Sequence, residues 1–287
     1  MVSKIVRRGI SFALLGVLLL MAAFLAGCGQ KTDEKAPAQK EDHALTGSLT
    51  IAGSTSVQPF SEVLAEKFQE INPKVQINVQ GGGSSQGVEA AISGAADIGS
   101  SSRELKSEEQ GKGLVETKIA LDGIAVVVHP SNKLVDMKIE DIRNIYLGNI
   151  KNWKEVGGEN APITVVCREE GSGTRGAFED IVMNKEKISN KVIIQNSTGA
   201  VRTTVAGDPK AIGFVSLASL NNEVKAVKID GIEASVENVK NGSYKISRPF
   251  LYLTKGEPQG LAKAFIDYVM SDEGQKIMVD EGAISIK

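Results

Sequence analysis

The sequence is organised around one short stretch that lies between two hydrophobic segments, Cys167-Arg168-Glu169-Glu170-Gly171-Ser172-Gly173-Thr174-Arg175-Gly176. The β-branched residues 163–166 before it predict a buried strand, and the apolar spacing of residues 177–183 after it predicts a helix. Gly171–Gly176 is therefore expected to form a turn from a strand end into a helix N-terminus. Free backbone N–H groups and the positive end of the helix dipole meet at such a place.

The side chains of this turn favour the binding of a small anion. Ser172 and Thr174 supply hydroxyl donors, and Arg168 and Arg175 supply guanidinium groups that suit a tetrahedral oxyanion. The alternative is ordinary helix capping by Ser172 or Thr174, with both arginines in solvent. This turn alone leaves the two interpretations open. It is not a P-loop, because no Gly-Lys-Ser or Gly-Lys-Thr follows the glycines.

Composition points to a globular protein and away from nucleic-acid binding. The chain has 287 residues, of which 41% are hydrophobic and 24% charged, enough for one large domain or two modest ones. The formal net charge is −2 and no basic run occurs, so nucleic acid is not an expected partner.

The first 27 residues predict a secretory signal peptide. Residues 10–25 are an almost unbroken apolar run, and the positive charges before them are Lys4, Arg7 and Arg8. The run ends in Leu25-Ala26-Gly27-Cys28, which resembles a bacterial lipobox and implies cleavage before Cys28 and a lipid on its sulfur. An uncleaved membrane anchor is the alternative, but the run is short for a span of about 20 residues.

Residues 28–46 are expected to form a flexible, lipidated tether, because they are rich in charged residues, Ala, Pro and Gln without an apolar period. Loss of residues 1–27 leaves a formal charge of −5, so an anion must be attracted locally. With Cys28 lipidated, Cys167 has no partner and is expected to be a small buried residue.

Strands and Gly/Ser-rich turns alternate with helices along the chain, which predicts an α/β fold with a mostly parallel sheet. The predicted strands include residues 48–52, 75–79 and 97–99 as well as residues 163–166. Ligands of such sheets bind outside the carboxyl ends of the strands, where hydroxyl-rich turns can converge. The hydroxyls concerned are those of Ser54, Thr55, Ser56, Ser84, Ser85 and Ser102. Their recurrence favours anion binding over capping at each separate turn.

Six ordered motifs resemble the phosphate-binding protein family of bacterial high-affinity phosphate ABC transporters. They extend over nearly the whole chain after the tether, and they are residues 52–59, 82–85, 97–99, 145–153, 168–174 and 211–215. The resemblance implies a two-lobed, type II periplasmic-binding-protein fold with phosphate in the cleft. Each lobe would be a mixed, mostly parallel sheet flanked by helices, and two crossover strands would join the lobes.

Residue by residue, the resemblance places the lobes and the ligand contacts. Lobe 1 would be residues 47–126 plus 247–287, and lobe 2 residues 127–246. The family's phosphate contacts fall on Thr55, Ser56, Ser84, Arg168, Ser172, Gly173 and Thr174. Ser54, Ser102 and Arg103 complete the expected site. Glu170 would hold Arg168 in place, Arg175 would support the site from behind, and neither a metal nor a cofactor is expected.

This sequence departs from the family pattern at Ser102, where better-known members carry an Asp that accepts the proton of monohydrogen phosphate. The sequence therefore leaves open which group accepts the phosphate proton here, and the candidates are the Ser102 hydroxyl, Glu170 or another carboxylate. Arg103 is either a second cation for the anion or the partner of a carboxylate.

The resemblance implies a monomeric, non-catalytic receptor that is lipid-anchored on the extracellular face of the cell membrane and delivers inorganic phosphate to a membrane permease. One alternative is a binding protein for another tetrahedral oxyanion, such as sulfate or molybdate. A secreted phosphatase or serine hydrolase is disfavoured, because the chain has only two histidines and no clustered metal ligands. A signalling or adhesive surface protein with the same fold is a third possibility.

Overall fold

The computed structural model describes residues 44–287. The predicted signal peptide, Cys28 and nearly all of the tether lie outside the described residues. Within the described part, no helix combines the length and the apolar character that a membrane span needs.

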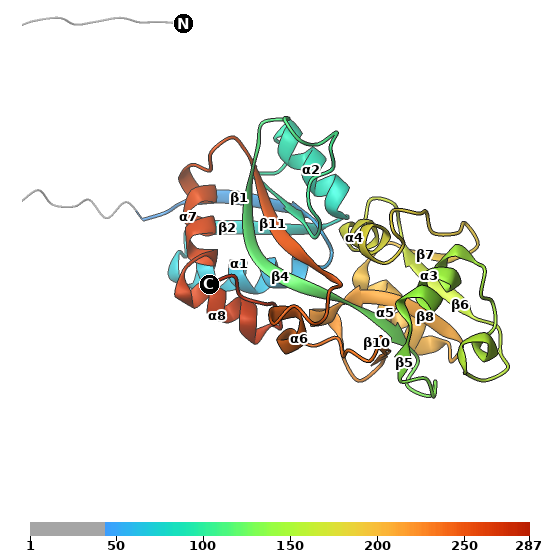
Figure 1. The fold of residues 1–287 in the computed structure, drawn as a ribbon. Helices are drawn as coiled ribbons and strands as arrows, with labels where there is room; N and C mark the ends of the chain where they lie inside the picture. Colours follow the sequence, from blue (N-terminus) through green and yellow to red (C-terminus); the bar gives the residue numbers. More distant parts are fainter. Residues whose placement is uncertain (1–43) are drawn as a thin grey trace, which may run out of the picture. The chain divides into compact units, whose positions relative to one another are not determined.

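One continuous sheet runs through the molecule in the strand order β2-β1-β3-β11-β4-β8-β6-β7 (Figure 1). These strands are β1 (Gly47–Gly53), β2 (Val75–Gly81), β3 (Ile98–Ser101), β4 (Leu114–Val128), β6 (Thr164–Arg168), β7 (Ile193–Gln195), β8 (Ala211–Ser216) and β11 (Ser247–Lys255). The short strand β9 (Lys225–Ala226) also pairs with β4, and a separate small sheet joins β5 (Asp136–Met137) to β10 (Lys228–Ile229).

The two ends of this sheet are parallel and its middle is antiparallel. β1 pairs in parallel with β2 and β3, and β6 pairs in parallel with β7 and β8. Between them, β4 pairs with β11 up to Gly123 and with β8 from Ile124 onward. β4 and β11 are thus the crossover strands that connect the two lobes (Figure 1).

Helices flank both parts of the sheet. They are α1 (Gln58–Ile71), α2 (Ser84–Ser93), α3 (Ile139–Leu147), α4 (Gly173–Ile181), α5 (Thr198–Gly207), α6 (Val236–Lys240), α7 (Gly260–Val269) and α8 (Asp272–Asp280), with 3₁₀ turns at Trp153–Val156 and Leu217–Ser219. In α1, Phe60, Leu64 and Phe68 recur at helical spacing and are buried together, which is why this segment folds as a helix on the sheet.

Each lobe has its own hydrophobic core. The core of lobe 1 packs α1, α7 and α8 on β1–β3 and the adjoining part of β11, with Phe68 and Phe265 edge to face. The core of lobe 2 is centred on Tyr146, Phe178 and Phe214, of which the last two stack with ring centroids 4.1 Å apart. The second core also includes residues 124–126 of β4. The residue limits given above for the lobes stay a prediction.

The expected α/β fold is confirmed, with one local correction at the central turn. Residues 171–176 are not all turn, because Ser172 is the N-cap and α4 begins at Gly173. Gly173 and Gly176 are poor helix formers and hide this first turn in the sequence. The capping bond from the Arg175 N–H to the Ser172 hydroxyl, 3.2 Å long, fixes the start of the helix.

A candidate anion site between the lobes

Four helices begin at the same place between the lobes. α1 and α2 start at the carboxyl ends of β1 and β2, while α4 and α5 start beyond the carboxyl ends of β6 and β7. The first turn of a helix has backbone N–H groups without intrahelical partners, and its dipole is positive there. Four such ends facing one region make it favourable for negative charge.

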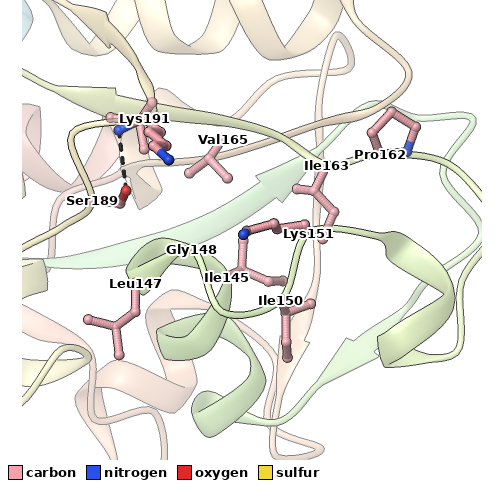
Figure 2. Close-up of a pocket in the computed structure, with 11 residues that line it drawn as sticks. Ile145, Leu147, Gly148, Ile150, Lys151, Pro162, Ile163, Val165, Ser189 and Lys191 are labelled. Atoms are coloured by element: carbon pink, nitrogen blue, oxygen red, sulfur yellow. Dashed lines mark hydrogen bonds between the residues drawn. The ribbon is translucent and has the colours of Figure 1, made fainter.

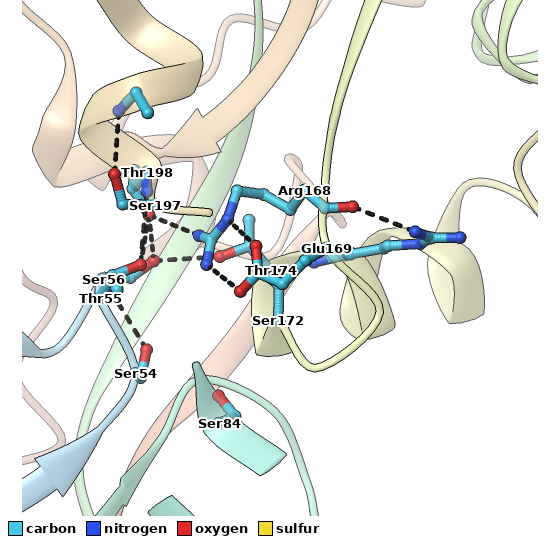
Figure 3. A network of polar contacts seen from close by, with 12 residues as sticks. Ser54, Thr55, Ser56, Ser84, Arg168, Glu169, Ser172, Thr174, Ser197 and Thr198 are labelled. Atoms are coloured by element: carbon cyan, nitrogen blue, oxygen red, sulfur yellow. Dashed lines mark hydrogen bonds and ion pairs between the residues drawn. The ribbon is translucent and has the colours of Figure 1, made fainter. Parts of the chain in front are cut away.

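Seven buried or half-buried hydroxyls meet at these helix ends, and we call them the hydroxyl cluster. Figure 3 shows six of them, all except Ser102. Its members are Ser54, Thr55, Ser56, Ser84 and Ser102 from lobe 1 and Thr174 and Thr198 from lobe 2. The sequence predicted all of them except Thr198.

Within lobe 1, the hydroxyl of Ser102 contacts those of both Ser54 and Ser84. The Ser54 hydroxyl donates to the Ser102 hydroxyl at 2.9 Å, and it accepts the backbone N–H of Ser56 at 3.2 Å. The Ser84 hydroxyl accepts the backbone N–H of Ser102 at 3.0 Å. The predicted convergence of the turns after β1, β2 and β3 is therefore present in the structure.

The cluster also joins the two lobes. The Ser56 hydroxyl lies 3.0 Å from that of Thr174 and 2.9 Å from that of Thr198. In addition, the backbone N–H of Ser85 in lobe 1 donates to the carbonyl of Gly171 in lobe 2 at 3.0 Å. These contacts require the lobes to be closed on each other.

Arg168 lies at the end of β6 and brings a positive charge to the cluster. Its Nη1 donates to the Thr198 hydroxyl at 3.0 Å, and the side chain is buried. The other edge of the guanidinium forms a two-point pair with Glu169, at 2.8 Å from Nε and 2.7 Å from Nη2.

The prediction that Glu170 holds Arg168 in place is wrong. Glu169 takes that role, while the side chain of Glu170 is 90% exposed and its nearest cation is Arg175, at 4.0 Å. The cause is the tight turn after β6, in which the N–H of Ser172 bonds to the carbonyl of Glu169 and which directs Glu170 into solvent. In this closed structure Glu170 is not placed to accept a proton from a ligand in the cluster.

Arg103 forms an ion pair of its own beside the cluster. Its two terminal nitrogens each lie 2.7 Å from an oxygen of Glu109, and Nη2 also donates to the Ser85 hydroxyl at 3.1 Å. Burial raises the pKa of Glu109, but the hydrogen bonds from Arg103 and from the Lys106 N–H outweigh it, so the pKa lies below its ordinary value. Of the two roles expected for Arg103, pairing with a carboxylate is the one observed.

Arg175 lies behind the site, as expected, and braces the strand that carries Arg168. Its Nη1 donates to the Arg168 carbonyl at 3.1 Å, and its Nε pairs with Glu179 at 2.8 Å. Burial raises the pKa of Glu179, but bonds from Arg175 and Lys187 outweigh this and lower it. Arg175 thus has its charge compensated away from the cluster.

Gly173 is the point where α4 comes closest to lobe 1. A Cβ at this position would lie 2.2 Å from the Ser84 hydroxyl and 2.6 Å from that of Ser102, both far inside van der Waals contact. Glycine is therefore required at Gly173 by the close approach of the two lobes, and the backbone N–H groups that begin α4 are brought to the hydroxyl cluster.

Sequence reasoning missed Thr198 and Glu169. Residues 197–199 carried a signal for Thr198, because Ser-Thr-Gly was recognised as a helix cap, and Ser197 does accept the N–H of Ala200 at 3.1 Å. That signal was interpreted as capping alone and not as a fourth helix end directed at the site.

Two other features lie outside the cluster. A pocket of about 400 Å³ opens in lobe 2 between α3 and β6, lined by apolar residues such as Ile145 and Ile163 and by Lys151 and Lys191; it shares no residue with the hydroxyl cluster (Figure 2).

Cys167 is buried, and burial raises the pKa of its thiol to about 12, so it remains an unreactive thiol. Among residues 44–287, no three His, Cys, Asp or Glu side chains are grouped to hold a metal ion.

Comparisons of this chain with known proteins agree on one family. A family model described as a PBP superfamily domain matches residues 34–273. The phosphate-binding protein PstS of Bacillus subtilis (strain 168) is 38% identical over 280 residues, which cover 94% of this chain and 93% of that protein.

Solved structures agree with this relationship. A putative phosphate ABC transporter substrate-binding protein from Clostridium perfringens, solved with bound phosphate, is 46% identical with a TM-score of 0.81, covering 84% of this chain and all of that one. An ABC-type phosphate transport receptor from Vibrio cholerae is 36% identical with a TM-score of 0.70, covering 82% of this chain and 99% of that one. The chain belongs to the PBP superfamily and, within it, to the family of the phosphate-binding protein PstS.

Proposed function

We propose that this protein captures inorganic phosphate in the hydroxyl cluster between its lobes and delivers it to the permease of a phosphate ABC transporter. The observation that carries the proposal is the arrangement around Arg168, in which hydroxyls of both lobes and four helix N-termini surround one guanidinium edge. These groups are hydrogen-bond donors to a tetrahedral oxyanion, and only a closed cleft brings them together.

The relatives favour a binding protein rather than an enzyme. Those compared above are named for phosphate binding or for phosphate transport, and one of them contains phosphate. The chemistry of the cluster is consistent with this, because Ser54, Ser56 and Ser84 have hydroxyl, amide or guanidinium partners and no histidine base among residues 44–287. Phosphate capture needs only donors and closure, and no group that attacks or transfers a proton.

The proposed contacts are those of both lobes. Hydroxyls, the Arg168 guanidinium and the backbone at Gly173 would donate to the anion. The proposed contacts are Ser54, Thr55, Ser56, Ser84, Ser102, Arg168, Ser172, Gly173 and Thr174. Thr198 is added to them because of its place in the hydroxyl cluster. Arg103 and Arg175 would support the site through their own ion pairs. The Ser102 hydroxyl, which can accept as well as donate, is the proposed acceptor of the phosphate proton, because it stands where the better-known members of the family that the sequence resembles carry an Asp.

We also propose that the mature chain is a monomer anchored by a lipid on Cys28 to the extracellular face of the cell membrane. The lipobox-like residues 25–28 and the charged tether that follows them support this. Replacement of Cys28 by Ser should move the protein from the membrane fraction to the soluble fraction, whereas unchanged membrane recovery would contradict a lipid at Cys28. Light scattering of the soluble form would then give its oligomeric state.

Titration calorimetry tests the ligand directly. The purified protein, freed of bound anion, is titrated with phosphate, then with sulfate and with molybdate. Tight one-to-one binding of phosphate without a sulfate signal is expected. Comparable binding of sulfate would mean that Ser102 does not distinguish a protonated ligand from an unprotonated one. Binding of sulfate or molybdate alone would reassign the protein to that anion.

A further inference from the structure

A second buried arginine lies close to the hydroxyl cluster, on a crossover strand. Arg248 of β11 and Asp122 of β4 face each other in the register of the two strands. Asp122 accepts from Arg248 Nη2 at 3.0 Å and from Nε at 3.2 Å, and only 3% of Arg248 and 1% of Asp122 are exposed. A pair so deeply buried has a high desolvation cost, which makes its position in the fold informative.

This ion pair connects both lobes at the point where the sheet changes from one to the other. Asp122 accepts from the hydroxyl of Ser216 on β8 in lobe 2 at 2.9 Å. Arg248 Nη2 donates to the hydroxyl of Ser56, in the turn after β1 of lobe 1, at 3.3 Å. A continuous polar chain therefore runs from lobe 2 through the crossover strands to the hydroxyl cluster.

The contact with Arg248 turns the hydrogen of the Ser56 hydroxyl away from the guanidinium. A guanidinium only donates, so the Ser56 oxygen must accept from it, and the single O–H of Ser56 stays available as a donor. Arg168 acts in the same way on Thr198, since its Nη1 donates to that hydroxyl at 3.0 Å. Two arginines thus occupy acceptor sites of two hydroxyls in the cluster and leave the hydrogens of both hydroxyls free to donate, which suits an anion.

One further nitrogen of Arg248 strengthens this interpretation. Its Nη1 is buried and has no hydrogen-bond partner among the described residues. An unsatisfied buried donor is costly, and an apolar residue here together with an uncharged one at position 122 would avoid the cost. A purely structural role would be served by such an uncharged pair, whereas orientation of Ser56 needs a donor.

We propose that Arg248, held by Asp122, is a positioning residue for the anion site, which orients the Ser56 hydroxyl as a donor and ties it to the crossover strands. This inference rests on the proposed function. Arg248 acts through Ser56, and its loss weakens phosphate binding because the Ser56 hydrogen is then no longer kept out of the direction that the guanidinium occupies.

The test compares variants of the purified protein by phosphate calorimetry and by thermal unfolding without phosphate. R248M should bind phosphate about tenfold more weakly or worse, the range for a lost hydrogen bond to a charged group. S56A should lose a similar factor, and R248M/S56A should bind no more weakly than the weaker single variant, because the two residues act as one unit. R202M, which removes a half-buried arginine of α5 that pairs with Glu223, is the control and should leave the phosphate affinity unchanged.

A neutral double variant separates positioning from stability. R248M alone leaves the Asp122 carboxylate buried without a counter-charge, and D122N/R248M removes that charge as well. The double variant should recover a large part of the thermal stability lost in R248M, while its phosphate affinity stays at the level of R248M.

Three outcomes would overturn the inference. They are an unchanged phosphate affinity in R248M, additive losses in R248M/S56A, and an affinity that recovers together with the stability in D122N/R248M. Failure of the unsubstituted protein to bind phosphate would instead overturn the proposed function, so the two failures are distinguishable.

Discussion

The two lobes contribute different chemistry to the same site. The edge of lobe 1 offers hydroxyls and helix N-termini, and the arginines beside it, Arg103 and Arg248, are already engaged by the carboxylates of Glu109 and Asp122. The edge of lobe 2 adds a guanidinium that reaches into the cluster, because Arg168 leaves Nη1 for Thr198 while Glu169 takes its other edge. We infer that lobe 2 supplies the charge that attracts the anion, and that lobe 1 supplies the close-fitting hydroxyls that complete its binding on closure.

Removal of the lobe 2 charge should have the largest effect. R168M is expected to weaken phosphate binding about 1,000-fold, since loss of one partner from a buried charge pair costs about 4 kcal/mol. R168K keeps the charge without the planar fork and should recover only part of the affinity. Calorimetry measures both, with circular dichroism to establish folding. R103M is the comparison in lobe 1, and an equal loss there would contradict the division of roles between the lobes.

The contact between the lobes can be broken at Gly173. In G173A the new methyl group would lie 2.2 Å from the Ser84 hydroxyl, so the lobes must separate before it fits. We expect phosphate affinity to fall about 100-fold, a cost of about 2.7 kcal/mol, with no loss of lobe stability because Ala favours a helix. X-ray scattering should find a more extended molecule in the presence of phosphate.

The matched control is G199A, in the first turn of α5. A Cβ at Gly199 meets no atom within 4 Å, so this variant should bind phosphate normally. Affinity of G173A within threefold of the unsubstituted protein would mean that closure does not require this close approach.

The ion pair of lobe 1 should matter for stability and its pH dependence. The pKa of Glu109 lies below its ordinary value in the folded protein, so its carboxylate stabilises the fold at pH values above the pKa of the unfolded chain, near 4.3. That contribution is lost as the pH falls through the lower, folded pKa. E109Q should therefore destabilise the protein by about 2 kcal/mol at pH 7, because Arg103 stays buried without a counter-charge.

The measurement is urea unfolding of E109Q and the unsubstituted protein between pH 7 and pH 3. The difference between them should begin to shrink near the pKa of the unfolded chain, about 4.3, and should be lost as the pH falls through the lower pKa of Glu109 in the folded protein. A difference that stays constant over this range would show that the charge of Glu109 is not the stabilising feature.

The sequence was sufficient for the lobe 1 hydroxyls and for the fold class, because both follow from local patterns. A β-branched run followed by Gly and Ser marks a strand end and a helix start, and parallel strands bring their carboxyl ends to one edge. Ser54, Ser84 and Ser102 could be grouped on this basis alone. The start of α4 could not, since Gly173 and Gly176 have low helix propensity and only the Ser172 cap reveals it.

Contacts made across long stretches of chain were beyond sequence reasoning. Asp122 and Arg248 are separated by 126 positions and meet only because β4 and β11 pair antiparallel in that register. Glu169 and Glu170 have the same chemistry and adjacent positions, and the direction of a single turn decides which of them reaches Arg168. No pattern of residue types encodes that direction.

The difference between Glu169 and Glu170 gives a local test of how the lobe 2 charge is held, and its expected effect is the smallest. Glu169 pairs with Arg168 through two hydrogen bonds and its side chain is 27% exposed, whereas Glu170 is nearly in open solvent. We expect E169Q to lower the free energy of unfolding by about 1 kcal/mol, since charged hydrogen bonds are lost from a half-buried pair. E170Q should cause no measurable change, because exposed pairs contribute little.

A double-mutant cycle with R168M makes the comparison independent of other effects of each substitution. The combined variant R168M/E169Q should be less destabilised than the sum of its two parts, because both changes remove the same interaction. R168M/E170Q should be additive. If coupling appeared with Glu170 instead, the turn after β6 would have to place that carboxylate on Arg168 in solution, and Glu170 would return as a candidate acceptor for the proton of the ligand.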